Sequence, residues 1–438
     1  MTVTTPSRTG YRAAFDAFTT NGAGGAPEWV QQIREASIDA FERVGFPTLK
    51  HEEWRFTDLS RLTETSFALG SGDASKLRSV LSYEALRDLP GPRLVFVDGH
   101  FVPEHSRVGD LPPGVTVDNL AHAMTKHREL VEPHLDRLTA AEDDGPTALN
   151  SAFLRDGAFV HVASGAQETE PIHAIFVSTA PAEPSMTHPR ALFVVEDGGH
   201  ATLVEDFVSA GSGFAFTNPL TEIVVGAKAN VRHYRVQREN DASYWIATTF
   251  IDQGEGSDFA SHSALLGGAV VRNNVYPVLS GSHCLSVLNG MYVPRGEQLH
   301  DSRMRVRHSY PHGESRQYYR GILDDRAKAM FSGRIIVDQD AQKTDAVQSN
   351  KNLLLSEHAL VETKPQLEIY ADDVKCTHGA TIGQLDEEAI FYFLARGIDR
   401  PTARRLLVFA FVNEIFERME LAPVREQLQA LVSRRLSE

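Results

Sequence analysis

Short runs of alternating hydrophobic and polar residues dominate the middle of the chain. Examples are FVHVA, PIHAIFVST, TEIVVGAKANVRHYRV and NLLLSEHALVETKPQLEI, which are rich in β-branched residues and are separated by Gly, Asp or Asn turns. From about Gly157 to Ile382 these runs predict about ten strands in succession, with almost no helical periodicity between them. The central part of the chain is therefore expected to be a β-domain.

The turns between these runs resemble one another. Several consist of a Gly or acidic residue, then a small residue, then an alternating strand, as in EDGGHATLVEDF, VGAKANVRHY and LSEHALVETKPQ. Repetition of one turn-plus-strand unit favours a coil of parallel strands in which each turn of the coil covers the next. An antiparallel sandwich has equally short strands and is the competing fold. Because the spacing drifts only modestly, we predict a parallel β-helix.

The residues on either side of this region have a different pattern. PEWVQQIREASIDAFERV carries an apolar helical stripe, with Pro27 suited to the first turn and Gly45 as a stop. LVFVDGHFV predicts a hairpin around Asp98-Gly99, and LAHAMTKHRELVEPHL predicts a further helix. We therefore expect an N-terminal α/β cap over residues 1–150, a β-helix core over 151–383 and a helical region over 384–438.

The helical region carries more apolar surface than one stripe requires. Asp386 can cap the first helix and Gly397 can close it, while Pro401 and Pro423 suit the first turns of the next two. Apolar residues from Leu406 to Phe416 cover nearly the whole circumference of the middle helix. Either that helix is buried among its neighbours, or another protein covers the excess.

Composition and charge exclude several classes of partner. The 438 residues contain 43 Lys and Arg against 58 Asp and Glu, a formal charge of −15, which repels the phosphates of nucleic acid and anionic lipid. The first residues lack the pattern of a signal peptide, and no apolar run approaches the roughly 20 residues of a membrane span. We expect a cytoplasmic protein with neither nucleic acid nor membrane as partner.

The stretch DDVKCTHGATIG holds the strongest candidate chemistry. On a strand, Cys376 and His378 point to the same face, so thiol and imidazole are expected side by side, and Gly379 allows another group to approach closely. Alternatively, Cys376 is an ordinary buried thiol and His378 a hydrogen-bonded residue. The two cysteines, Cys284 and Cys376, cannot supply the four thiolates of a self-contained zinc or iron–sulfur site.

Other candidates carry less information. His308 and His312 lie four apart in RHSYPHGE, but Pro311 and Gly313 indicate a loop there. The carboxylate pairs HEEW and LDDR are adjacent in sequence, so their side chains usually point apart. The chain contains no P-loop, no strand-anchored GxGxxG, no GxSxG and no CxxC. The sequence thus gives no support for an autonomous enzyme.

Four segments carry a family resemblance: KHEEWRFTDL, RQYYRGIL, GRIIVDQDAQKTDAVQSNKNLLLS and KPQLEIYADDVKCTHGATIGQLDEEAIFYFLARGI. Together they resemble the SufB/SufD family of iron–sulfur cluster assembly scaffolds, most closely in its SufD form, with the strongest match over residues 316–398. The SufB form carries extra cysteines, whereas this chain has two. The resemblance implies a right-handed parallel β-helix between helical ends, with no catalytic activity of its own.

The resemblance also implies partners and a site. It implies that a SufB-like subunit meets the β-helix and that a SufC-like ATPase docks on the C-terminal helices. A coil edge that pairs with a relative also invites pairing with a second copy, a homodimer of the isolated chain, which the sequence leaves open. The resemblance assigns the family's implicated histidine to His378, with Cys376 as its neighbour, so that a transient iron–sulfur cluster is shared with the partner and no cofactor is stably bound alone. A stand-alone metalloenzyme using Cys376, His378 and loop histidines and a β-helix carbohydrate-active enzyme are the alternatives.

Overall fold

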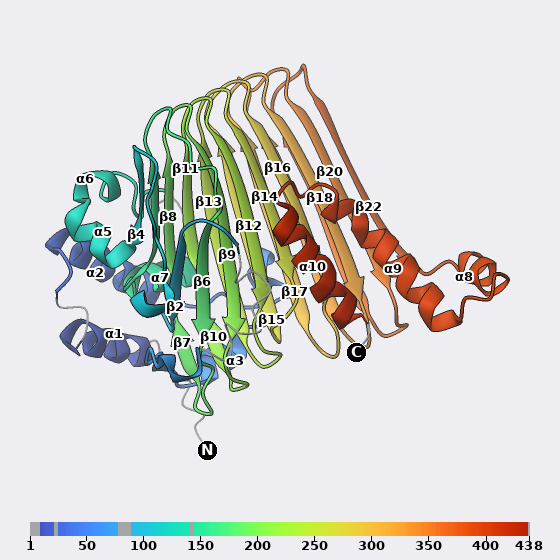
Figure 1. Cartoon of the computed structure of the whole chain (residues 1–438), viewed down its shortest axis with the longest axis horizontal. Helices are drawn as coiled ribbons and strands as arrows, with labels where there is room; N and C mark the ends of the chain where they lie inside the picture. The colour runs from blue at the N-terminus through green and yellow to red at the C-terminus, as the bar shows by residue number, and fades with distance from the viewer. Residues whose placement is uncertain (1–8, 22–24, 78–88, 140–143, 437–438) are drawn as a thin grey trace.

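The structure is a computed structural model that describes residues 9–21, 25–77, 89–139 and 144–436. Two long sheets face each other, and the chain passes from one to the other at each turn, which gives a flattened solenoid (Figure 1). Neighbouring long strands pair in parallel, as the coil prediction requires, and the antiparallel sandwich is excluded. The predicted fold class, a mainly β parallel β-helix between an N-terminal α/β region and C-terminal helices, is confirmed.

Within the described residues the two sheets contain twelve and ten strands. The twelve-stranded sheet consists of β1 (Ala68–Leu69), β4 (Val115–Asn119), β5 (Gly157–Val162), β7 (Ser185–Thr187), β8 (Arg190–Val195), β10 (Ala215–Thr217), β11 (Leu220–Val225), β13 (Tyr244–Gln253), β15 (Val270–Leu279), β17 (Leu299–His308), β19 (Lys328–Val337) and β21 (Leu360–Ile369). The ten-stranded sheet consists of β2 (Arg93–Val97), β3 (His100–Phe101), β6 (Ile172–Ser178), β9 (His200–Ser209), β12 (Asn230–Arg238), β14 (Asp258–Leu265), β16 (Leu285–Tyr292), β18 (Glu314–Leu323), β20 (Asp345–Leu354) and β22 (Lys375–Gln384).

A ladder of corner residues keeps the turns in register. At one corner of each turn a residue adopts a positive φ and donates its backbone N–H to the carbonyl of the next turn, for example His312 to Gln342 at 2.9 Å. The residues of this ladder are Gly165, Gly198, Lys228, Gly256, His283, His312 and Lys343. Each corner therefore fixes the position of the next, and corresponding residues of successive strands stack in columns.

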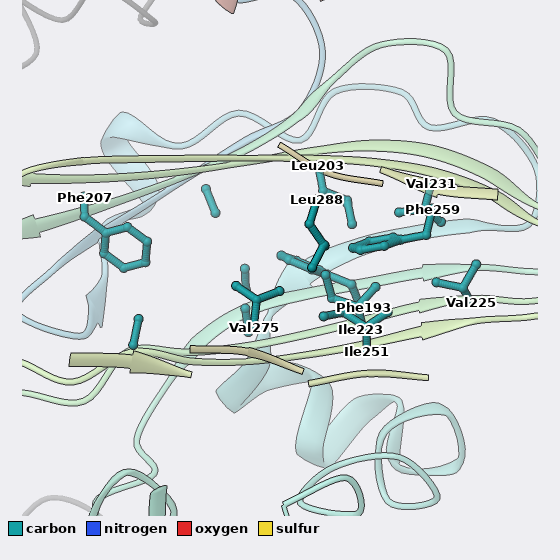
Figure 2. Packing of buried hydrophobic residues seen from close by; sticks show 14 of the residues in the cluster. Phe193, Leu203, Phe207, Ile223, Val225, Val231, Ile251, Phe259, Val275 and Leu288 are labelled. Atoms are coloured by element: carbon teal, nitrogen blue, oxygen red, sulfur yellow. The ribbon is translucent and has the colours of Figure 1, made fainter. Parts of the chain in front are cut away.

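The interior of the solenoid combines apolar packing with buried polar groups. Figure 2 shows packed apolar side chains, among them Phe193, Leu203 and Phe259. Glu205 and Arg235 form a buried ion pair in the early turns. The inward-facing side chains of the later turns include a further buried set of polar residues: Gln317, Tyr319, Gln348, Asn350 and Asn352.

The N-terminal region combines short helices with the first strands of both sheets. Its helices are α1 (Thr9–Asn21), α2 (Glu28–Val44), α3 (Ser60–Glu64), α5 (Leu120–Lys126), α6 (Arg128–Val131) and α7 (Gly145–Ala152), with 3-10 turns η1 (Glu52–Trp54), η2 (Ala74–Lys76) and η3 (Pro103–His105). β2 pairs in parallel with β6, so the solenoid already includes strands from the zone that the sequence assigned to the cap.

Local predictions in this region are mostly correct. The hairpin at Asp98-Gly99 is present, with positive φ at both residues and Phe96 opposite Phe101. Gly45 ends α2 with a φ of 71°, although Pro27 lies at the N-cap position just before the helix. The helix expected over LAHAMTKHRELVEPHL is split into α5 and α6, because the backbone of His127 leaves the helical region at φ −122° and ψ 39°.

Three helices form the C-terminal region: α8 (Glu387–Leu394), α9 (Arg400–Phe416) and α10 (Ala422–Arg435). Helices α9 and α10 lie across the outer face of the ten-stranded sheet, whereas α8 projects beyond the solenoid (Figure 1). Asn289 Nδ2 donates to the Ile415 carbonyl at 3.0 Å, and the Tyr234 hydroxyl accepts from the Leu421 N–H at 3.0 Å. No helix of the described chain is long and apolar enough to cross a membrane.

Most of the apolar excess of α9 is buried within the chain. Val408, Val412, Ile415 and Phe416 are buried against the sheet and α10, and Phe409 and Phe411 pack partly against the same cluster. This accounts for most of the apolar surface between Leu406 and Phe416, although Leu406 itself is 45% exposed. The first of the two alternatives, burial among neighbours, therefore accounts for α9.

Candidate functional site

Cys376 and His378 lie on β22, the last strand of the ten-stranded sheet. Within the described chain this strand pairs only with β20, where Cys376 lies opposite Ala346 and His378 lies opposite Gln348. The other edge of β22 has no neighbour among the described residues. Ala346 and Gln348 are buried and point into the solenoid, so the same columns direct Cys376 and His378 toward its interior. The two candidate residues thus sit side by side at the open end of the coil.

The two side chains have different surroundings. Cys376 is half-buried and packs at the edge of a small apolar cluster with Ile335, Ala346 and Leu367. Burial raises the pKa of the Cys376 thiol, so in the isolated chain the sulfur carries its proton at neutral pH and must lose it to bind a metal. His378 is exposed. The imidazole is therefore accessible, while the thiol beside it is partly covered by the last turn.

The same turn leaves two sheet edges open. β21 ends the twelve-stranded sheet as β22 ends the other, and each is ten residues long. β22 is exposed at nearly every position, in contrast to the buried strands before it. Long unpaired edges expose rows of N–H and C=O groups that can pair with a further strand. Cys376 and His378 lie directly on one of these edges.

Cys284 does not belong to this site. It is buried at the start of β16, and its thiol contacts the carbonyl oxygens of Gly254 and Gly281 at 3.0 and 3.1 Å. Three strand spacings separate it from Cys376, which is about 14 Å at the usual 4.8 Å per strand. A disulfide requires Cα atoms within about 7 Å, so the two cysteines cannot pair within the chain.

The sequence pair His308 and His312 is not a ligand pair. His308 is buried inside the solenoid, where its Nε2 lies 2.9 Å from Ser315 Oγ, and burial lowers its pKa to about 4. His312 lies on the corner ladder, exposed, and its ring stacks on that of His283 with centroids 4.7 Å apart. The loop indicated by Pro311 and Gly313 is present. It places the His308 imidazole inside the solenoid and the His312 imidazole on its surface.

The carboxylates of HEEW hold the N-terminal region to the outer face of the twelve-stranded sheet. Glu53 pairs with Arg303 at 2.8 Å, and Glu52 pairs with Lys364 of β21 at 2.6 Å. Between them the buried Trp54 ring covers the Arg272 guanidinium, 3.5 Å from ring centroid to carbon. These contacts favour a clamp over an acid–base pair, as the sequence reasoning expected of adjacent carboxylates.

This clamp borders a cleft of about 420 Å³ that the sequence reasoning missed. Its floor carries Arg272, Arg303, Arg305 and Arg334 on the outer faces of three successive strands. The alternation of arginine in RMRVRH was a signal that these side chains share one face of a strand. Asp301, Glu53 and Glu368 pair with three of the four, so the cleft has little excess positive charge.

The described residues contain no group of three or more His, Cys, Asp or Glu side chains placed to hold a metal ion. Cys376 and His378 therefore supply at most two protein ligands from this chain, where iron–sulfur and zinc sites commonly use four.

Helix α8 carries exposed aromatic side chains. Phe391 is 69% exposed and Tyr392 57%, and the exposed Leu394 is close by on the same helix. Asp386 caps the helix, as predicted, by accepting from the Glu388 N–H at 2.8 Å. Because α8 projects from the solenoid (Figure 1), these side chains contribute little to the core of the chain.

Comparison with known proteins gives consistent matches over almost the whole chain. Residues 176–411 match the model described as "SUF system FeS cluster assembly, SufBD core domain", and residues 6–174 match "SufBD protein N-terminal region". Among similar proteins is the Escherichia coli iron–sulfur cluster assembly protein SufD, 32% identical with 96% of this chain and 95% of the relative covered. A Synechocystis SufBD family protein, slr0076, is 34% identical, covering 91% and 90%. The chloroplastic protein ABCI7 of Arabidopsis thaliana is 31% identical, covering 91% and 84%.

Proposed function

The chain belongs to the SufBD family of iron–sulfur cluster assembly proteins, and from this premise we propose that it is a non-catalytic scaffold that builds a cluster site together with a second subunit. His378, with Cys376 beside it on β22, offers one side of a composite site for iron and sulfide. A SufB-like subunit supplies the remaining ligands. Neutral imidazole and thiolate both suit iron.

One observation carries this proposal: Cys376 and His378 lie on a long, unpaired edge strand at the open end of the solenoid. A related β-helix can add its own strands to β21 and β22, and side chains of that second β-helix then lie next to His378. The pair of candidate ligands within the chain is incomplete alone, which supports a shared site. The same edges can accept a second copy of this chain when the partner is absent.

The C-terminal region supports a second contact. α8 presents Phe391 and Tyr392 to solvent and stands apart from the solenoid, so we assign it, in place of the buried α9 face, as the docking element for a SufC-like ATPase. Helices α9 and α10 tie α8 to the ten-stranded sheet. Movement of the ATPase subunits on binding ATP would then be transmitted through these helices to the joint between the two coils.

The test is assembly and reconstitution. The full chain is co-purified with SufB-like and SufC-like subunits, and cluster formation from Fe²⁺ and sulfide is followed by absorbance in the wild type and in His378→Ala. We expect an intact complex that forms little or no cluster in His378→Ala. A variant complex that assembles its cluster at the wild-type rate would overturn the role of His378.

Two further measurements separate the parts of the proposal. A chain without α8 (Glu387–Leu394) is expected to keep the SufB-like subunit and lose the ATPase, whereas normal recruitment of the ATPase would refute the docking assignment. Metal analysis of the isolated full chain is expected to find far less than one bound metal ion per chain. Stoichiometric metal retention by the isolated chain would instead favour the stand-alone metalloenzyme.

A further inference from the structure

A column of polar side chains inside the solenoid ends at His378. Gln317 of β18, Gln348 of β20 and His378 of β22 occupy the same register position on three successive strands. Gln317 and Gln348 are buried, whereas His378 has no strand above it among the described residues. Adjacent positions in such a column are about 4.8 Å apart, which is within reach of side-chain hydrogen bonds.

The Gln348 amide is held in a fixed position. Its Nε2 donates to Gln317 Oε1 at 2.9 Å, one strand below. On the opposite wall, Gly333 leaves room for it: a Cβ at that position would lie 1.9 Å from Gln348 Nε2. The side chain therefore spans the interior from one sheet to the other, and its orientation is set by the strand below and the wall opposite.

The carbonyl oxygen of the Gln348 amide has no hydrogen-bond partner among the described residues. Gln348 Oε1 is buried and accepts no hydrogen bond within the described residues. An unsatisfied buried acceptor costs about 1–3 kcal/mol. The hydrogen bond to Gln317 therefore uses only the amide nitrogen of Gln348, and the oxygen stays available to a further donor.

We infer that Gln348 is a positioning residue for His378: its vacant Oε1, one strand below the histidine, accepts an imidazole N–H once the His378 ring turns toward the interior. This inference rests on the proposed role of His378 as a ligand for iron in the shared site. With one ring nitrogen fixed as the donor, the other nitrogen keeps its lone pair and faces the open end, where iron arrives. Outer-shell hydrogen bonds of this kind fix the tautomer and the ring orientation of ligating histidines.

The chain provides a matched control for the test. Gln348→Met removes the acceptor next to His378 at nearly constant volume, and Gln253→Met makes the same change at a buried glutamine of β13, on the other sheet and outside this column. Loss of an outer-shell partner typically weakens metal affinity about 10–100-fold. In the complex with the SufB-like subunit, we expect Gln348→Met to weaken Fe²⁺ affinity by that factor and Gln253→Met to weaken it less than about threefold.

A spectroscopic readout tests the hydrogen bond without the cluster. In the isolated chain labelled with ¹⁵N-histidine, the His378 ring, assigned by its loss in His378→Ala, is expected to show one fixed tautomer. In Gln348→Met the two tautomers are expected to exchange. Averaged ring shifts in the wild type would overturn the inference even if Gln348→Met fails to fold.

The outcomes distinguish this inference from the proposed function. If His378→Ala leaves iron binding unchanged, the proposed role of His378 fails and the inference fails with it. If His378→Ala abolishes binding but Gln348→Met and Gln253→Met behave alike, only the positioning role is wrong. In the His378→Ala background, Gln348→Met should cause no further loss, because it acts through that imidazole.

Discussion

The body of the solenoid and its last turns place buried polar groups in different settings. In the body, the buried carboxylate of Glu205 is bound by a threonine, a histidine and an arginine. Unpaired polar atoms also occur there, such as Asn273 Nδ2, but strands on both sides cover them. In the last turn, Thr363 Oγ1 is buried without a partner on the edge strand β21, and Gln348 Oε1, one strand from the edge strand β22, also has no partner among the described residues. Only at that end can the missing partners come from outside.

The closed body should be sensitive to acid. Burial lowers the pKa of five imidazoles to about 3 or 4, namely those of His173, His188, His262, His300 and His308. The unfolded chain takes up these protons first, so stability is full above the ordinary histidine pKa of 6.5 and falls as pH drops toward the folded values. Each imidazole contributes about 2 kcal/mol of loss between pH 6.5 and 5.

Two buried carboxyl groups act in the opposite direction. Burial raises the pKa of Asp156 to about 6 and that of Glu239 to about 8, so these two groups gain stability as pH falls toward the ordinary carboxyl values. Because five imidazoles outnumber two carboxyls, we expect a net loss of several kcal/mol between pH 7 and 5. Urea unfolding midpoints measured across that range check it, and a flat profile would contradict it.

Removing an apolar side chain should cost much more stability in the body of the solenoid than at its open end. Phe259 is fully buried in the apolar interior (Figure 2), so Phe259→Ala is expected to cost about 3–5 kcal/mol of unfolding free energy. Leu360, at the start of the edge strand β21, is 58% exposed, and Leu360→Ala should change stability by less than about 0.5 kcal/mol. Denaturant unfolding of the isolated chain measures both. Similar costs at the two positions would show that the open end is as tightly packed as the body.

Helix α8, which projects from the solenoid, should contribute to binding of a partner and little to the stability of the chain. Phe391→Ala should weaken binding of the ATPase subunit by about 1–2 kcal/mol, or roughly tenfold in Kd, since exposed aromatic anchors commonly dominate interfaces. It should leave the stability of the chain unchanged, because Phe391 contacts little of the core. The control is Leu49→Ala, an exposed apolar residue of the N-terminal region. Calorimetric titration measures both variants, and equal effects would remove α8 from the interface.

Local sequence patterns predicted local structure well. Strand alternation, the Asp98-Gly99 hairpin, the Asp386 cap and the Gly45 stop all depend on residues within a few positions of one another, and all are present. A separation of two residues on one strand was also enough to place Cys376 and His378 on a common face. These results depend on backbone geometry that neighbouring residues fix.

Relations across turns of the coil could not be predicted in the same way. His312 stacks on His283, and Gln348 lies beneath His378, because about 30 residues separate corresponding positions and the corner ladder sets their register. Local spacing suggested His308 as the neighbour of His312 instead. Similarly, the apolar circumference of α9 showed that the helix is buried, but not that the ten-stranded sheet of its own chain buries it.

The smallest expected effect on the chain itself gives the sharpest test of the open end. Ile382 lies on β22 in an inward-facing column and is 51% exposed, so Ile382→Lys should change the stability of the isolated chain by less than about 0.5 kcal/mol. If a second β-helix covers that end, the same lysine becomes a desolvated, unpaired charge and pairing with the SufB-like subunit is lost. Tyr310→Lys makes the matched change at an equally exposed corner, 50%, away from both edges. Pull-down and ultracentrifugation should show an intact complex for Tyr310→Lys and none for Ile382→Lys, because only the second substitution puts a charge where the coil continues into its partner.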